Sequence, residues 1–223
     1  MRLRFSRSQH ATLQRLGVAL VLIAAALPVA AQNTFMDDCI PPLNSAYVGQ
    51  FHARYSDGTN IYDLTQPQHD RFTSCDSAPP SGVAVHSFGS MVSAQISVNN
   101  GPMMPLQGNA NTTVRVEADG TAGPTRFFDT EMLQLDLVAG PALIRESPSR
   151  PSLGRTSITD VGGGQFRIDS FFDVFTELSL DGGQTWHQST DPAGNPAPGR
   201  MALPGTVAVT KAPWSRVKSI YKE

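Results

Sequence analysis

The sequence predicts an all-β fold, with an antiparallel β-sandwich as the first choice and an irregular β-barrel as the alternative. Three stretches, 92–98, 113–117 and 133–137, alternate apolar and polar residues as half-buried strands do. Glycine and proline make up 36 of the 223 residues, and turn-forming groups such as residues 99–102 separate the stretches. We find no apolar stripe at helical spacing over three turns after residue 31. Several short strands joined by tight turns are therefore expected.

Residues 1–31 have the pattern of a secretory signal peptide. Four arginines and no acidic residue precede an unbroken apolar run at 16–27, and small residues follow Pro28 at 29–31. A membrane anchor is the rival interpretation, but a spanning helix needs roughly 20 apolar residues and this run has 12. We expect a protein that is secreted or held in the cell envelope, with no membrane span once the signal is removed.

The rest of the chain is expected to form a single β-rich domain over residues 32–210 and a basic tail over residues 211–223. Beyond residue 31 there are 13 basic and 19 acidic residues. Because nucleic-acid binding needs clustered Lys and Arg, we expect no nucleic-acid partner. The tail is interpreted as solvated or partly docked, with partner binding as the sharper alternative. Residues 188–204, rich in proline and glycine, are expected to be a loop.

Two cysteines, Cys39 and Cys75, are the only ones in the chain. Export places them in an oxidising compartment, where a pair usually forms a disulfide. Such a bridge stabilises by roughly 3–4 kcal/mol on the chain-entropy model. Free thiols or a metal site are the alternatives, and no histidine pair at ligand spacing supports a metal.

Residues 165–186 form the longest alternating stretch. It exceeds the usual strand length of roughly 3–10 residues, so we expect a bulge or corner near Ser170. One face is expected to point into the core; its apolar members are Phe166, Ile168, Phe172, Val174, Leu178 and Leu180.

The opposite face of this stretch carries a row of four carboxylates, Asp169, Asp173, Glu177 and Asp181. Residues four apart on a straight strand lie about 13 Å apart, too far to share one ion without help from other strands. A solvated strand face is therefore the main expectation, and no cofactor is expected. A calcium site and a paired-carboxylate glycosidase are the alternatives.

The end of the stretch, residues 179–186, reads S-x-D-x-G-x-T-W. This pattern resembles the Asp-box, a hairpin motif repeated in sialidases and other β-propellers. The resemblance implies a structural turn, with Asp181 bonded to turn backbone and the indole packed on the hairpin, and it implies no catalytic role. A single copy does not predict a propeller, which needs repeated blades. The residues of this structural hairpin are Ser179, Asp181, Gly183, Thr185 and Trp186.

A longer segment, residues 144–186 (IRESP…GGGQFRIDSFFDVFTELSLDGGQTW), resembles one that recurs in exported bacterial proteins of uncharacterised function. Many of those resemble proteins with a C-terminal sorting or docking segment. Residues 211–223 depart from that pattern, because they lack a hydrophobic anchor. The resemblance implies export and no particular activity.

No G-x-S-x-G elbow, H-E-x-x-H helix or phosphate-binding loop is found in the sequence. The four histidines after residue 31 are expected on the surface; they are His52, His69, His86 and His187. We expect a non-enzymatic structural or surface-associated module that contacts a surface polymer or a protein. A carbohydrate- or ligand-binding module using Phe171, Phe175 or Trp214 is the alternative. A hydrolase ranks third, and a cleft with two carboxylates or a Ser/His pair would favour it.

The signal pattern leads to a prediction about processing. The precursor is expected to be cut after Ala31, leaving Gln32 first, because Val29 and Ala31 offer the small side chains that signal peptidase reads. Mass spectrometry of the exported protein measures this. Recovery of residues 1–31 intact in a membrane fraction would contradict it.

Overall fold

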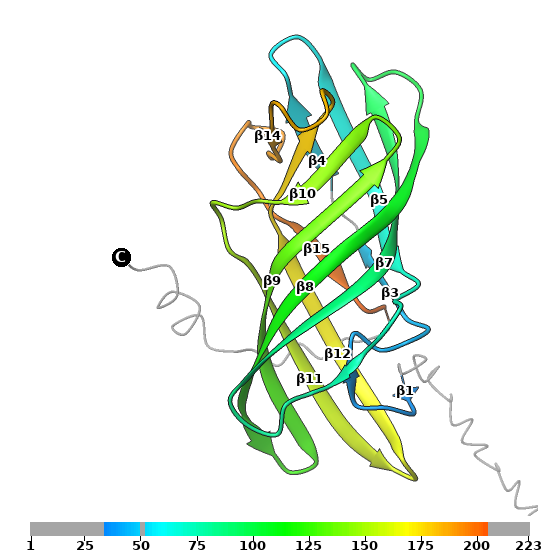
Figure 1. The fold of residues 1–223 in the computed structure, drawn as a ribbon, viewed down its shortest axis with the longest axis vertical. Helices are drawn as coiled ribbons and strands as arrows, with labels where there is room; N and C mark the ends of the chain where they lie inside the picture. The colour runs from blue at the N-terminus through cyan, green and yellow to red at the C-terminus, as the bar shows by residue number, and fades with distance from the viewer. Residues whose placement is uncertain (1–33, 50–51, 205–223) are drawn as a thin grey trace, which may run out of the picture.

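The computed structural model describes residues 34–49 and 52–204, and within them the chain is all-β (Figure 1). The predicted all-β class is therefore confirmed, and of the two architectures left open the structure is the barrel. The signal region, the basic tail and Trp214 lie outside the described residues. The strands are β1 (Thr34–Phe35), β2 (Cys39–Ile40), β3 (Ala46–Gly49), β4 (His52–Ser56), β5 (Ile61–Asp70), β6 (Asp76–Ser77), β7 (Val83–Val98), β8 (Met104–Ala122), β9 (Thr125–Ala139), β10 (Ala142–Glu146), β11 (Ser152–Gly162), β12 (Gln165–Val174), β13 (Thr176–Ser179), β14 (His187–Gln188) and β15 (Gly199–Ala202).

Eight antiparallel strands close the barrel. The ring runs β3, β5, β7, β8, β9, β11, β12, β15 and back to β3. Its last strand, β15, lies in the segment 188–204 that the sequence predicts to be a loop, so that prediction is wrong at Gly199–Ala202. Four residues are too few to show an alternation. Only pairing with β12 and β3, both distant in sequence, makes this segment a strand.

A second set of strands extends the barrel beyond this ring, because two long strands divide their length between partners. The first part of β9 pairs with β11, and its last part, from Asp136, pairs with β10. In the same way β5 pairs first with β4 and then with β3. Beyond β10 the sheet continues through β13 and β14, and a bridge between Arg54 and Thr190 joins this end to β4. A single bridge therefore connects the two ends of the extension.

The core is the interior of the barrel, because side chains of each strand point alternately inward and outward. On β7 the inward positions include Phe88, Ala94 and Ile96, which are buried, whereas Val85 faces outward and is 58% exposed. The buried apolar side chains form one cluster. Those at most 1% exposed include residues of β4 and of the neighbouring ring strands β8, β9, β11 and β12: Tyr55, Val114, Val116, Phe128, Ile158 and Ile168. One enclosed core thus holds the whole domain together.

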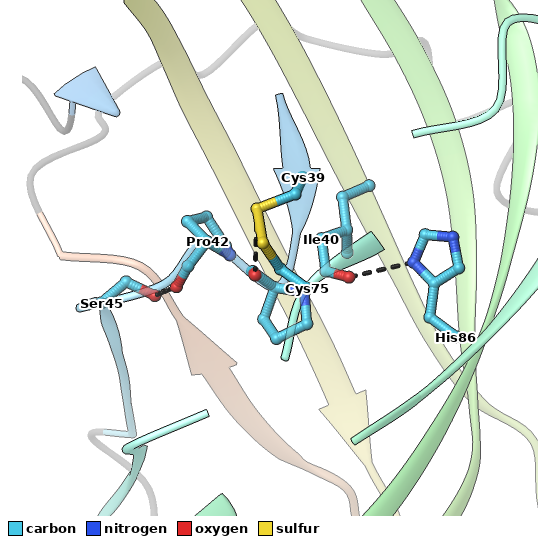
Figure 2. Close-up of a disulfide and its surroundings, with 7 residues drawn as sticks. Cys39, Ile40, Pro42, Ser45, Cys75 and His86 are labelled. Carbon is cyan, nitrogen blue, oxygen red and sulfur yellow. Dashed lines mark hydrogen bonds between the residues drawn. A yellow bond between two sulfur atoms is a disulfide. The ribbon is translucent and has the colours of Figure 1, made fainter. Parts of the chain in front are cut away.

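A short two-stranded unit of β2 and β6 is crosslinked by the predicted disulfide, which is confirmed (Figure 2). The Cα atoms of Cys39 and Cys75 are 5.4 Å apart. Ile40, next to the bridge, is 1% exposed, and its carbonyl oxygen accepts a hydrogen bond from His86 Nδ1 at 2.9 Å. The bridge therefore fixes a segment that itself forms part of the interior.

The long stretch 165–186 is interrupted at Phe175, not at Ser170. Pairing of β12 with β11 is regular across Ser170, so the bulge predicted there is absent and that prediction is wrong. At Phe175 the chain instead changes partners, from β11 and β15 to β10 and β14. The inward face is not shifted, since Val174 and Leu178 are both buried. Leu180 is 38% exposed, so its predicted core position is also wrong: β13 ends at Ser179, and the alternation ends with it.

The two leucines of this segment provide a matched pair for testing the core assignment. Leu178→Ala is expected to lower the free energy of unfolding by about 2–5 kcal/mol, because it empties a fully buried site. Leu180→Ala is expected to change it by less than about 1 kcal/mol, because that side chain already contacts water. Urea unfolding followed by tryptophan fluorescence measures both. Equal losses would show that the face assignment is incorrect.

Candidate functional site

The barrel interior contains a cavity of about 70 Å³. Its walls are almost entirely apolar, and no Asp, Glu, Lys or Arg side chain lines it. Aliphatic side chains from β7, β8, β9 and β10 form one part of the wall; they include Val92, Ala94, Leu106, Leu135, Leu137 and Ile144. Ile40 and Pro41, next to the disulfide, contribute as well. Small apolar cavities of this kind stay dry and accept apolar molecules, so this space is the candidate site.

An aromatic cluster lies against the cavity. Phe72 is at its centre, with ring centroids 5.1 Å from His69, 5.5 Å from Phe88 and 6.0 Å from Tyr47. Tyr47 in turn lies 5.9 Å from Phe172. Edge-to-face and tilted arrangements at these distances are favourable and hold the rings in place. We call these five residues the aromatic floor of the cavity; all of them line it.

His69 is the one imidazole that lines the cavity. The side chain is buried, and its Nε2 shares a hydrogen bond of 2.5 Å with Ser90 Oγ. Among the described residues the ring has no other hydrogen-bond partner. Burial lowers the pKa of His69 from about 6.5 to about 4, because the apolar surroundings disfavour the charged form. At neutral pH the site therefore presents an uncharged imidazole.

The two tyrosine hydroxyls in the cavity wall are already paired. Tyr47 donates to Ser170 Oγ at 2.9 Å, and the hydroxyls of Tyr55 and Thr176 lie 2.7 Å apart. Burial raises the pKa of Tyr55 to about 12 and that of Tyr47 further, so both phenols stay neutral. These bonds pair polar atoms that the barrel buries, and among the described side-chain nitrogen and oxygen atoms of the cavity lining they leave only Nδ1 of His69 without a hydrogen-bond partner.

His69 and Ser90 are a Ser/His pair of the kind that would favour a hydrolase, and their setting differs from that of a catalytic pair. A catalytic imidazole is oriented by a third group on its other nitrogen, and among the described residues Nδ1 of His69 has no such partner. A ring with a pKa of about 4 is also a weak base at neutral pH. Ser90 itself contacts the carbonyl oxygen of Ala110 at 3.4 Å. The hydroxyl therefore positions the ring.

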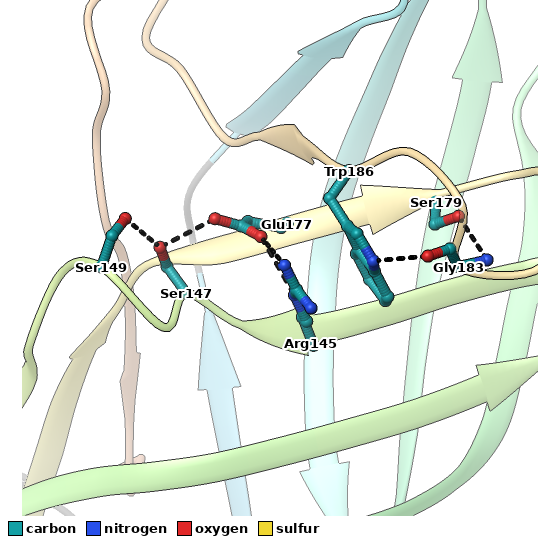
Figure 3. A network of polar contacts seen from close by, with 7 residues as sticks. All are labelled: Arg145, Ser147, Ser149, Glu177, Ser179, Gly183 and Trp186. Carbon is teal, nitrogen blue, oxygen red and sulfur yellow. Dashed lines mark hydrogen bonds and ion pairs between the residues drawn. The ribbon is translucent and has the colours of Figure 1, made fainter.

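The structure does not bring the four carboxylates of the predicted acidic row together. Asp173 pairs with Arg200 at 2.7 Å, and Glu177 pairs with Arg145 at 2.7 Å and accepts from Ser147 Oγ at 3.0 Å (Figure 3). Asp169 lies 4.0 Å from Arg167. Within 34–49 and 52–204, no group of three His, Cys, Asp or Glu side chains could hold a metal ion. Each carboxylate is thus matched by its own neighbour on the outer surface.

Asp181, the last of the row, organises the turn after β13. Its Oδ1 accepts hydrogen bonds from the backbone N–H groups of Gln184 and Thr185 at 3.0 and 2.9 Å, and from Ser179 Oγ at 2.8 Å. Its Oδ2 accepts from Thr185 Oγ1 at 2.6 Å. These bonds lower the pKa of the carboxyl well below its usual range. The turn contacts expected of Asp181 are therefore present.

The indole of Trp186 completes this turn. Its Nε1 donates to the carbonyl oxygen of Gly183 at 3.0 Å, and the guanidinium of Arg145 lies 4.0 Å from the ring centroid (Figure 3). Gly183 has a φ of 88°, a conformation that favours glycine. The hairpin residues thus bond mostly to one another, and they lie apart from the set that lines the cavity.

Two of the three aromatic rings that the sequence offers for ligand stacking, those of Phe171 and Phe175, lie against arginines, and the third, Trp214, lies outside the described residues. Arg200 lies 4.2 Å from the ring centroid of Phe171, and Arg150 lies 5.6 Å from that of Phe175. A sugar that stacked on these rings would have to displace a guanidinium group. The outer surface of β12 is therefore less suited to carbohydrate than the sequence suggests.

The sequence did not indicate the site, because no sequence pattern marks His69 as a buried residue. His69 and His86 are buried, so their predicted surface positions are wrong. In the sequence His69 follows Pro67 and Gln68, and a bulge between Thr65 and Gln68 breaks the alternation that would have marked it as inward-facing. The cavity itself is lined from strands throughout the chain, so no local motif could have indicated it.

Comparisons with protein-family models, with curated proteins and with solved structures found no match to this chain. In the described ranges, no helix is long and apolar enough to cross a membrane. The function is therefore inferred from the geometry of the cavity.

The lowered pKa of His69 predicts how stability depends on pH. In the unfolded chain the imidazole takes up a proton near pH 6.5, and in the folded protein only near pH 4. The contribution of His69 to the free energy of unfolding is therefore fully present above about pH 6.5. Between pH 6.5 and pH 4 it is lost, and the free energy of unfolding falls by about 3 kcal/mol, because the unfolded chain takes up the proton first. His69→Leu is expected to remove this loss, as urea unfolding at pH 7 and pH 4 would measure.

The comparison of His69→Leu with wild type removes the contributions of the other titrating groups to the change in stability between pH 7 and pH 4, because both proteins share them. Glu146 is the main one, because burial raises its pKa to about 7 and its contribution is lost as the pH rises, in the opposite direction. If wild type and His69→Leu lost the same stability between pH 7 and pH 4, the imidazole would be accessible to protons in the folded state.

Proposed function

We propose that this chain is an exported, non-enzymatic binding protein that holds a small, largely apolar molecule inside its barrel. The observation that carries the proposal is the cavity: about 70 Å³ of space within a closed eight-stranded barrel, with apolar walls and one polar group with unused capacity. Eight-stranded barrels are wide enough to hold one small ligand. Burial of apolar ligand surface supplies the affinity.

One end of the barrel offers a route to the cavity. Leu106 lines the cavity and is only half-buried, and Met104 is two residues away on the same inward face of β8 and is 46% exposed. Met104 pairs with Ile96 in the register of β7 and β8, beyond the point where β9 ends its pairing with β8. At this end the inward face of β8 therefore meets solvent, and a ligand can enter past the flexible side chain of Met104.

Export is the second part of the proposal. It is supported by the signal pattern of residues 1–31 and by the disulfide, which is a bond of oxidising compartments. The disulfide also fixes Ile40, which lines the cavity, so the binding site is completed where the bridge forms. A secreted or envelope location therefore suits the proposed site.

The cavity favours an apolar ligand over the carbohydrate alternative. A sugar carries several hydroxyls that need partners when buried, whereas the cavity wall has one uncommitted polar group. The proposed binding role is non-enzymatic and uses the interior of the barrel, not its outer surface.

Toluene binding to the exported chain tests the proposal. Toluene is expected to raise the melting temperature of the wild-type protein in proportion to the logarithm of its concentration, because it binds the folded state only. Ala94→Leu is expected to abolish the rise, because the larger side chain fills the cavity that Ala94 lines. Differential scanning calorimetry measures both.

Val85→Leu serves as the matched control, because Val85 lies on the same strand and faces solvent. It is expected to keep the full toluene response. If wild type shows no rise with toluene, cyclohexane or hexane, the proposed function is rejected. A rise that persists in Ala94→Leu would place binding elsewhere.

A further inference from the structure

We propose that the ligand carries a neutral hydroxyl group next to a compact apolar body, and that this hydroxyl bonds Nδ1 of His69 while the body packs on the aromatic floor. The inference rests on the proposed function and adds the chemical class of the ligand. An alcohol or phenol of about the size of one six-membered ring meets the description.

The arrangement of hydrogen bonds at His69 identifies where the polar group of the ligand belongs. Ser90 occupies Nε2 at 2.5 Å, and among the described residues nothing occupies Nδ1. The ring lines the cavity and the side chain is buried, so its surroundings offer Nδ1 few partners, and a ligand in the cavity can supply one. A ligand that bonds this nitrogen recovers the lost hydrogen bond, whereas a hydrocarbon does not.

The bonding of Ser90 explains why a hydroxyl fits better than a pure donor or a pure acceptor. The Ser90 hydroxyl hydrogen can point to Nε2, or to the carbonyl oxygen of Ala110 at 3.4 Å. In the first case Nδ1 carries the hydrogen and donates; in the second Nδ1 accepts. A hydroxyl group both donates and accepts, so it matches the ring in either tautomer.

The wall of the cavity argues against a charged ligand. No ionised side chain lines it, so a carboxylate or an ammonium group would be buried without a counter-charge. The nearest hydroxyls, those of Tyr47 and Tyr55, are already bonded to Ser170 and Thr176. One neutral polar group is therefore what the site can satisfy.

The size and shape of the site limit the apolar part of the ligand. A cavity of about 70 Å³ is smaller than one that holds benzene, about 150 Å³, so a ring requires some neighbours to move. Met132 and Met201 line the cavity, and methionine side chains rearrange at low cost. The tilted and edge-to-face rings of the floor provide faces on which a flat ring can pack.

The test compares phenol with toluene, which have nearly the same shape but differ in the hydroxyl group. Isothermal titration calorimetry is carried out on the wild-type exported chain and on His69→Leu. In the variant, the affinity for phenol is expected to fall about tenfold more than the affinity for toluene, because only phenol loses a hydrogen bond. An equal change for both ligands would overturn the inference and leave the proposed function standing.

A second measurement needs no variant. The ¹⁵N chemical shift of His69 Nδ1 is expected to move when phenol is added to the wild-type protein, and to stay unchanged with toluene at equal occupancy. A shift at Nε2 alone, or no shift with phenol bound, would also overturn the inference. Failure of both phenol and toluene to bind would reject the proposed function itself.

Discussion

The backbone of Phe175 joins the two parts of the barrel. Its N–H donates to Ser152 Oγ at 3.0 Å, and its carbonyl oxygen accepts from the N–H of Ser147 at 2.8 Å. Before this residue the chain belongs to β12, and after it to β13, each with its own neighbours. Since a buried backbone group without a partner is costly, the change of neighbours is stable only because these two bonds bridge it. The junction thereby connects the closed ring to the strands that extend it, β10, β13 and β14.

Enclosure then decides which polar groups the interior can contain. Water is largely excluded, so inward-facing hydroxyls tend to bond one another, as Thr156, Ser170 and Tyr47 do through contacts of 2.8 and 2.9 Å. The buried hydroxyl of Thr130 is an exception, because it has no hydrogen-bond partner among the described residues. His69 follows the same rule at Nε2 and departs from it at Nδ1. An uncommitted nitrogen beside an apolar cavity is a local loss of stability that a bound molecule can recover. Proteins often keep such departures where they bind ligands.

The outer surface of β12 and β13 shows the opposite pattern, because its carboxylates are paired with arginines. Along β12 and β13, Asp173 and Glu177 each hold an arginine, and the same arginines, Arg200 and Arg145, lie over aromatic rings. These contacts are worth little individually in water. Together they leave few unpaired groups along this edge, so the features that distinguish this protein from a generic barrel lie in its interior.

Three features could be predicted from the sequence alone: the all-β class, the Cys39–Cys75 disulfide and the inward face of residues 172–178. Alternation with period two is a local signal of a strand, and a chain with only two cysteines allows only one disulfide. The sequence did not distinguish a barrel from a sandwich. The barrel closes where β15 pairs with β3, and these two strands are separated by most of the chain. The candidate site is likewise formed only by the tertiary structure. Its residues alternate inward on separate strands, and His69 lies after a bulge that hides its direction. Side chains so far apart in the chain become neighbours only when the ring closes, so no stretch of sequence could show them together.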